Sequence, residues 1–204
     1  MFEDIIESLK TYPKIMDGKE AILYLKEHNY NWKQMEWSGW FNELWMQLNV
    51  PSIKKGRTYG RTKFDGLYND FDIDFKAHDI EKDTVICNDK NAMYESICQH
   101  GKIYLIVSIF KYDKDKDGEF KKWHDELKGK KSSYVKKCEK LNKKSRIRKT
   151  KEYLQKINIY ELNENNLNIC NGFQKGFENS GGSKRKEKLT LNLTKIEPII
   201  EIIT

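Results

Sequence analysis

The chain has 204 residues and a formal net charge of +7, and this length suits one buried core better than two independent domains. No apolar run approaches the length of a membrane span, and the acidic start at Glu3 and Asp4 differs from the basic start of a signal peptide. We therefore expect a single domain over residues 1–204, in a soluble, cytoplasmic protein with no membrane partner.

Residues 1–50 are predicted to form a helical N-terminal part. Apolar residues recur at helical spacing over residues 2–9, and Asp17 and Glu20 form a capping box ahead of a second apolar segment. A third helix is predicted over residues 37–48. Its apolar stripe should face the core and consists of Trp37, Trp40, Phe41, Leu44, Trp45 and Leu48.

Residues 60–113 are predicted to form the catalytic core. From Phe71 the sequence alternates, so that aromatic and branched residues face one side of a β-strand while Asp72, Asp74 and Lys76 face the other. Aspartate is a poor strand former, so folding alone does not explain these charges. The alternative is an ordinary solvated polar face on an edge hairpin.

The first half of this segment is predicted to supply a partner for those charges. Residues 63–68 can pair with the strand through a turn at Asn69-Asp70, which would bring Asp65 alongside Asp74 and Lys76. Two carboxylates at close range repel each other unless a hard cation lies between them, and Mg²⁺ prefers such oxygen ligands. The lysine could stabilise the negative charge that develops when water attacks a phosphorus atom. The pattern therefore predicts phosphodiester hydrolysis.

Asp65, Asp74 and Lys76 resemble the motif of the PD-(D/E)XK nucleases, and more narrowly that of the type II restriction endonucleases. Phe64 stands where the family motif often has proline. The resemblance implies an α/β fold with a mixed central β-sheet flanked by helices, and Mg²⁺ held by Asp65, Asp74 and the carbonyl of Phe75. It also implies a homodimer on a twofold DNA site and a companion DNA methyltransferase.

One further acid is a candidate catalytic residue. Restriction enzymes of this fold often carry an acid on the helix before the first catalytic strand. Glu43 is the only carboxylate near the end of the helix predicted over residues 37–48. The alternative is an ordinary exposed glutamate.

The rest of the core block is predicted to contain a helix and a long strand. Asn88-Asp89 can cap a helix over residues 91–99, and residues 102–110 form an apolar run typical of a strand buried on both faces. Residues 113–118 resemble the start of a calcium-binding loop, but His124 occupies the position of its last acidic ligand. We therefore expect a loop or turn there.

The segment 120–151 carries most of the positive charge. From Lys121 to Lys151 fourteen Lys or Arg residues stand against three acids, a local net charge of +11 that leaves −4 for the remainder. We expect one or two basic helices that bind double-stranded DNA through its phosphates. The alternative is a solubilising helix face. The C-terminal part, residues 157–204, is predicted to contain strands at 157–162, 189–193 and 199–203, joined by polar loops.

Candidate DNA-binding residues come from the basic loop that precedes the motif, from the basic segment, and from the glycine-containing loops 171–176 and 180–186. For each loop the alternative is a plain surface loop. The candidates are Lys54, Lys55, Arg57, Arg61, Lys130, Lys131, Lys136, Lys137, Gln174, Lys175, Lys184 and Arg185.

Four cysteines lie far apart in the sequence, at Cys87, Cys98, Cys138 and Cys170. We expect them to be reduced and mostly buried, as in a cytosolic protein. Neither the cysteines nor the four histidines have the spacing of zinc ligands.

Taken together, these features predict a Mg²⁺-dependent type II restriction endonuclease that hydrolyses double-stranded DNA at a short sequence. Two alternatives stay open. A junction resolvase or a repair nuclease would share the three motif residues but would cut according to DNA shape. A non-enzymatic DNA-binding protein would need only the basic segment.

Overall fold

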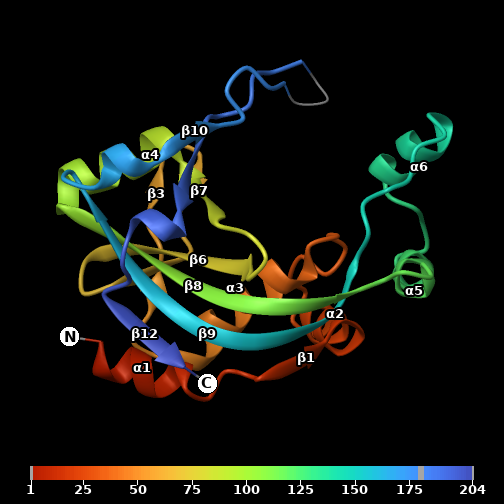
Figure 1. The fold of residues 1–204 in the computed structure, drawn as a ribbon, viewed down its shortest axis with the longest axis horizontal. Coiled ribbons are helices and arrows are strands. Elements are labelled where there is room, and N and C mark those ends of the chain that lie inside the picture. The colour runs from red at the N-terminus through yellow and green to blue at the C-terminus, as the bar shows by residue number, and fades with distance from the viewer. Residues whose placement is uncertain (1, 179–181, 204) are drawn as a thin grey trace.

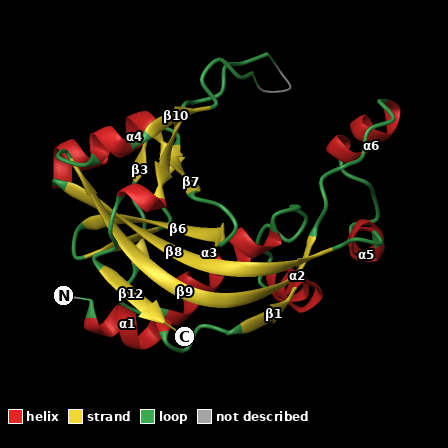
Figure 2. Ribbon diagram, in the orientation of Figure 1, coloured by secondary structure: helices red, strands yellow, loops and turns green. Residues whose placement is uncertain are grey.

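A computed structural model describes residues 2–178 and 182–203 (Figure 1). Within these ranges the chain forms a curled, mixed β-sheet with helices on both of its faces (Figure 2). The expected α/β class with a mixed central sheet is therefore confirmed. None of the described helices is long and apolar enough to span a bilayer.

The central sheet has seven strands, in the order β1-β9-β8-β6-β5-β2, with β12 paired to β9. These strands are β1 (Ile15–Asp17), β2 (Lys54–Lys55), β5 (Gly66–Tyr68), β6 (Phe71–Asp79), β8 (Lys102–Lys114), β9 (Lys149–Asn163) and β12 (Ile200–Ile203). The central pair, β6 and β8, is parallel, and the other pairs are antiparallel. Parallel neighbours need a crossover, which here runs through β7 (Thr84–Asp89) and α4 (Lys90–His100).

β8 lies at the centre of the main sheet, between β6 and β9. Its residues from Ile103 to Phe110 are all buried, which confirms the predicted strand with two covered faces. The strand runs on to Lys114, so Asp113 and Lys114 belong to the sheet and not to the expected loop. The carboxylate of Asp115 then accepts the main-chain N–H groups of Phe120 and Lys121 in the first turn of the next helix.

One face of the sheet is covered by three N-terminal helices, α1 (Glu3–Leu9), α2 (Gly18–Glu27) and α3 (Trp37–Asn49). Asp17 caps α2 as predicted, since its Oδ1 accepts the N–H of Lys19 at 2.8 Å. The short strand β1 was not predicted within the helical N-terminal part. It has only three residues and exists through its pairing with β9.

The predicted apolar stripe of α3 is confirmed except at Leu48, since Trp37, Phe41, Leu44 and Trp45 are buried and Trp40 packs against the core. Leu48 is 51% exposed, whereas Ser38, Asn42 and Met46 are fully buried. Hydrogen bonds explain why the buried face also includes two polar residues: Ser38 Oγ lies 2.9 Å from the hydroxyl of Tyr112, and the hydroxyl of Ser108 donates to Asn42 Oδ1 at 2.8 Å. Buried polar side chains need such partners, so the two on α3 turn toward β8.

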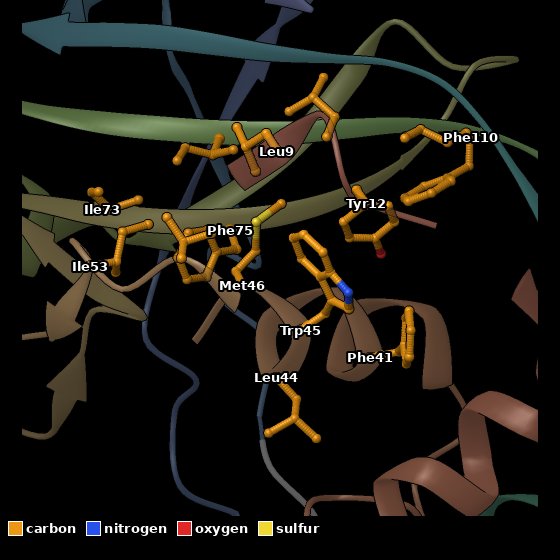
Figure 3. Close-up of a cluster of buried hydrophobic side chains, with 14 of the residues drawn as sticks. Leu9, Tyr12, Phe41, Leu44, Trp45, Met46, Ile53, Ile73, Phe75 and Phe110 are labelled. Carbon is orange, nitrogen blue, oxygen red and sulfur yellow. The ribbon is translucent and has the colours of Figure 1, made fainter. Parts of the chain in front are cut away.

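The core between these helices and the sheet is rich in aromatic side chains (Figure 3). Met46 of α3 lies beside Phe75 of β6, and Phe41 and Trp45 of the same helix pack against Tyr12. Tyr12 packs edge-on against the indole of Trp45, with 4.6 Å between ring centroids. This packing fixes α3 relative to β6, and both elements carry residues of the candidate site.

The opposite face of the sheet is covered by α4, by two 3₁₀ helices and by two small sheets. The predicted helix at 91–99 is confirmed, with Asp89 Oδ1 accepting the N–H of Ala92 and Gly101 (φ 84°) ending it. The other elements on this side are β3 (Thr58–Tyr59), β4 (Thr62–Lys63), η1 (Leu167–Ile169), β10 (Asn171–Phe173), β11 (Lys188–Asn192) and η2 (Leu193–Lys195).

The basic segment contains two short helices, α5 (Glu119–Leu127) and α6 (Ser133–Lys140), which project from one end of the sheet (Figure 1). The helical prediction to residue 151 is wrong beyond Lys140, because β9 begins at Lys149 rather than near Ile157. Leu141, expected in the apolar stripe of these helices, is 54% exposed. The early part of β9 is polar in sequence and becomes a strand through its pairing with β8.

The cysteines are less buried than predicted. Only Cys87 is buried, Cys98 is exposed, and Cys138 and Cys170 are intermediate. Cys98 follows the buried Ile97 on α4 and therefore points away from the sheet. The prediction of mostly buried thiols is wrong for this reason.

The buried Glu152 is expected to make stability depend on pH. Burial raises the pKa of its carboxyl from 4.5 to about 8, against smaller opposing effects of Ser38 and Lys149. Its contribution is therefore fully present below about pH 4.5 and is lost as the pH rises through about 8. Urea unfolding of the wild type and of Glu152→Gln at pH 5, 7 and 9 measures this effect.

The neutral amide in Glu152→Gln should gain stability relative to the wild type at each higher pH. One pKa unit corresponds to about 1.4 kcal/mol, so the relative change across this range should reach several kcal/mol. A constant difference between the two proteins from pH 5 to pH 9 would contradict the assignment. Comparing the two proteins cancels the contributions of all other titrating groups.

Candidate active site

The candidate site lies where the hairpin of β5 and β6 opens. Asn69 (φ 46°) and Asp70 (φ 64°) form the left-handed two-residue turn, and Gly66 pairs with Ile73. The predicted hairpin is therefore confirmed. β5 begins at Gly66, which pairs with Ile73, so Asp65 precedes the paired residues and lies next to Asp74, where β5 no longer covers this edge of β6.

The structure brings Asp65, Asp74 and Lys76 together. Asp65 Oδ2 accepts the main-chain N–H of Phe75 at 2.8 Å. The ammonium of Lys76 lies 2.5 Å from Asp74 Oδ2, with the aspartate side chain 2% exposed and the lysine side chain 20% exposed. Three charged groups thus form a largely buried cluster at the edge of one strand.

The electrostatics of these groups show that they act on each other. Burial raises the pKa of Asp65 well above its ordinary value, and the negative charge of Asp74 adds to this rise. Burial alone would lower the pKa of Lys76, but the carboxylates of Asp74 and Asp65 raise it above its ordinary value. Lys76 is therefore a protonated ammonium throughout the physiological pH range.

Glu43 reaches the same site from α3. Burial raises the pKa of its carboxyl, the hydroxyl of Tyr30 donates a hydrogen bond to it, and the charges of Lys76 and Asp74 also act on it. Gln47 Nε2 links the two elements, since it contacts Glu43 Oε1 at 3.4 Å and the carbonyl of Asp65 at 3.3 Å. Glu43 is thus half-buried and internally bonded, unlike an ordinary exposed glutamate.

Sequence reasoning missed three residues that contact the site: Gln47, Tyr30 and Asn88. The amide of Asn88 donates to Asp74 Oδ1 at 3.4 Å and to the carbonyl of Lys63 at the same distance. Gln47 lies one turn beyond Glu43 on α3, which is a local signal for a shared face. Tyr30 and Asn88 approach through the folding of distant segments, so no local pattern marks them.

The donor set fits a hard divalent cation. Asp65 and Asp74 offer carboxylate oxygens, and the hydrogen bond from Phe75 N to Asp65 places that main chain at the site. Among the described residues no group of three or more His, Cys, Asp or Glu side chains is arranged around a metal position. Mg²⁺ commonly uses one or two carboxylates and keeps several waters. A cation between the acids would offset the repulsion that raises the pKa of Asp65.

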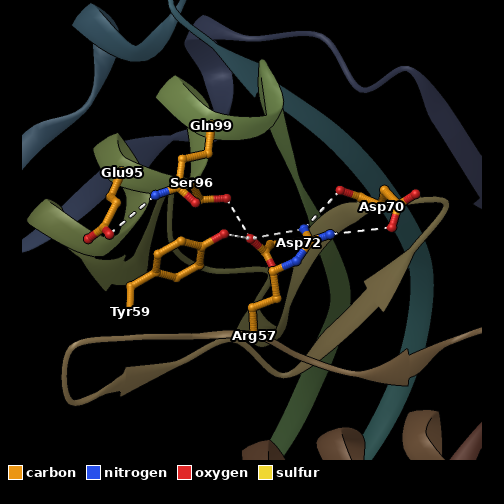
Figure 4. A network of polar contacts seen from close by, with 7 residues as sticks. All are labelled: Arg57, Tyr59, Asp70, Asp72, Glu95, Ser96 and Gln99. Atoms are coloured by element: carbon orange, nitrogen blue, oxygen red, sulfur yellow. Dashed lines mark hydrogen bonds and ion pairs between the residues drawn. The ribbon is translucent and has the colours of Figure 1, made fainter.

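Asp72, placed by its sequence on the same face, has a separate role (Figure 4). It is fully buried and accepts hydrogen bonds from the hydroxyls of Tyr59 and Ser96, each at 2.6 Å. Arg57 lies 3.8 Å from its Oδ2 and also binds the carbonyl and carboxylate of Asp70. Arg57 therefore has internal partners, and its contact with DNA stays a prediction.

Of the other predicted DNA-binding residues, Lys54 and Lys55 on β2 line the same cavity as Asp65, whereas those of the basic segment and of the late loops lie on other elements. Those of the basic segment lie on and before α6, and those of the late loops lie on the connection between β10 and β11 (Figure 1). Lys131 is paired with Glu139 at 2.8 Å. Ser180 and Gly181, within one predicted loop, lie outside the described residues. The roles of all these residues in DNA binding stay predictions.

Comparison of the chain with protein-family models, with curated proteins and with solved structures finds no match. Any statement about activity therefore depends on the geometry and charge of the site.

Proposed function

We propose that this protein is a Mg²⁺-dependent endonuclease that cleaves double-stranded DNA at a short sequence, with a restriction-endonuclease-like fold of the PD-(D/E)XK type. The observation that carries the proposal is the meeting of Asp65, Asp74 and Lys76 at the open edge of β6. Two adjacent carboxylates with an ammonium beside them are the groups that phosphodiester hydrolysis requires. The parallel β6 and β8 joined through α4 are consistent with such a fold.

Asp65, Asp74 and the carbonyl of Phe75 would hold Mg²⁺, which when bound would supply Lewis-acid stabilisation of the phosphate oxygens and a more acidic water. Lys76 contributes a fixed positive charge, because its raised pKa keeps it protonated. Asp74 holds this ammonium in place at 2.5 Å. The side chain therefore needs no rearrangement to stabilise charge that develops on the attacked phosphate.

Two further groups position Asp65. The N–H of Phe75 fixes the carboxylate of Asp65, and Gln47 holds the carbonyl of the same residue. Glu43 orients Gln47 in turn. In this proposal Glu43 is a positioning residue, and its role depends on the packing of α3 against β6.

The proposal extends to partners. Each chain has one such site and would cut one strand, so cleavage of both strands requires a second copy on a twofold DNA site. A companion DNA methyltransferase would protect the DNA of the host cell, and the enzyme would act in the cytoplasm. The basic segment, with its local charge of +11, would supply sequence-independent affinity for phosphates.

Incubation of purified protein with long DNA of known sequence tests the proposal. With Mg²⁺ we expect discrete fragments with defined ends, and with EDTA we expect intact DNA. A smear, or a preference for branched DNA, would instead indicate a structure-specific nuclease. Intact DNA that still shifts on a gel would indicate a DNA-binding protein without nuclease activity, and would refute the proposal.

A further inference from the structure

A small cavity opens directly beside Asp65. Its volume is about 300 Å³, and its wall is formed by Gln47, Ile53, Lys54, Lys55, Lys63 and Asp65. Three of these six residues are lysines, and they come from two different strands, β2 and β4. The lining therefore contributes three positive charges and one carboxyl group.

The three ammonium groups are unpaired within the described part of the chain. No carboxylate oxygen of the described residues lies within 4.0 Å of the side-chain nitrogen of Lys54, Lys55 or Lys63. Asp65 is the only acidic residue among the six that line the cavity. Like charges at close range destabilise each other, so the cavity favours an anion.

The backbone that carries these lysines is held in place. β2 pairs with β5, with Lys55 opposite Gly66. The loop between the lysines closes on itself, because Phe64 N–H donates to the carbonyl of Arg57 at 2.9 Å. A Cβ on Gly56 would lie 2.0 Å from the carbonyl oxygen of Phe64, so only glycine allows this approach. The loop is further anchored by the pairing of Arg57 with Asp72.

We propose that this cavity is a phosphate subsite, which binds the DNA phosphate next to the one that is cleaved. The inference rests on the proposed nuclease function, since Asp65 both lines the cavity and belongs to the candidate active site. Lys54, Lys55 and Lys63 surround the neighbouring phosphate, and the attacked phosphate then lies against Asp65, Asp74 and Lys76. Binding at the neighbouring phosphate sets the position of the scissile bond.

The subsite is tested with DNA in which one phosphate next to the cut is replaced by an uncharged methylphosphonate. We expect this change to slow cleavage by the wild type about tenfold or more. The double variant Lys55→Ala/Lys63→Ala should be slow on normal DNA and should lose no further activity with the modified DNA. Lys116→Ala, which changes a lysine outside the cavity, should respond to the methylphosphonate as the wild type does. An equal penalty in all three proteins would overturn the subsite.

A second measurement separates this subsite from the nuclease proposal. Inorganic phosphate is titrated without Mg²⁺, and the main-chain amide signals of residues 54, 55 and 63 are followed by NMR. Saturable shifts that weaken in Lys55→Ala/Lys63→Ala would support an anion site even if the protein cleaves no DNA. Absence of saturable shifts at these amides would overturn the subsite, whether or not the protein proves to be a nuclease.

Discussion

Replacing Asp74 with Asn is expected to reduce the rate of DNA cleavage by about 10³-fold or more. The substitution keeps the size of the side chain but removes the negative charge that would hold Mg²⁺. It also removes the partner that lies 2.5 Å from the Lys76 ammonium. Both effects act on the charge distribution around the phosphate, so the loss should appear in the single-turnover cleavage rate at saturating protein.

DNA binding should behave differently from cleavage in this variant. The basic segment is untouched, so gel-shift affinity without Mg²⁺ should equal that of the wild type or exceed it, because one acidic group near the DNA is lost. Asp83→Asn is the matched control: Asp83 is an exposed acid outside the site, and its variant should cleave at the wild-type rate. Wild-type cleavage by Asp74→Asn would remove Asp74 from the catalytic machinery and with it the proposed mechanism.

The candidate site was accessible to sequence reasoning because its main parts are close in sequence. Asp65, Asp74 and Lys76 lie on one hairpin, and the Asn69-Asp70 turn determines its register. A two-residue turn leaves little freedom for which residues face each other. The relation between the two acids therefore follows from local rules, without knowledge of the rest of the fold.

The elements that were mispredicted depend on distant contacts. β1 is short and pairs only with β9, and the first part of β9 is polar and pairs with both β1 and β8. These pairings form only after the chain has folded back. The burial of two polar residues on α3, which the apolar stripe did not include, has the same origin, because Ser38 and Asn42 contact hydroxyls on β8. Periodicity predicts which side of a helix is apolar, but it cannot include polar partners that come from another segment.

Asp72 illustrates the limit of the motif itself. It alternates with Asp74 on the same strand face, and only the folded structure separates the two roles. Asp74 meets a lysine at the open strand edge, whereas Asp72 is covered by the loop carrying Tyr59 and by Ser96 on α4. The difference arises from what covers each position, which is set by neighbouring elements, here β3 and α4, and not by the strand itself.

This difference leads to a prediction of stability rather than catalysis. Asp72→Ala is expected to lower the free energy of unfolding by about 3–5 kcal/mol. The substitution leaves the hydroxyls of Tyr59 and Ser96 without their common acceptor, and it removes one of the two carboxylates near Arg57. Buried donors that lose their acceptors keep the full cost of desolvation. Urea unfolding followed by tryptophan fluorescence measures the change.

The control for this prediction is Asp70→Ala, because Asp70 pairs with the same arginine in a different environment. The Asp70 side chain is 90% exposed, while that of Asp72 is 0% exposed. An exposed ion pair contributes about 1 kcal/mol or less, so Asp70→Ala should have a small effect. A similar loss in both variants would mean that the charge on Arg57, and not the burial of Asp72, controls stability. The double variant Asp72→Ala/Ser96→Ala should lose clearly less free energy of unfolding than the two single variants lose in sum. The reason is that removing the Ser96 hydroxyl also removes one of the donors that Asp72→Ala leaves unpaired.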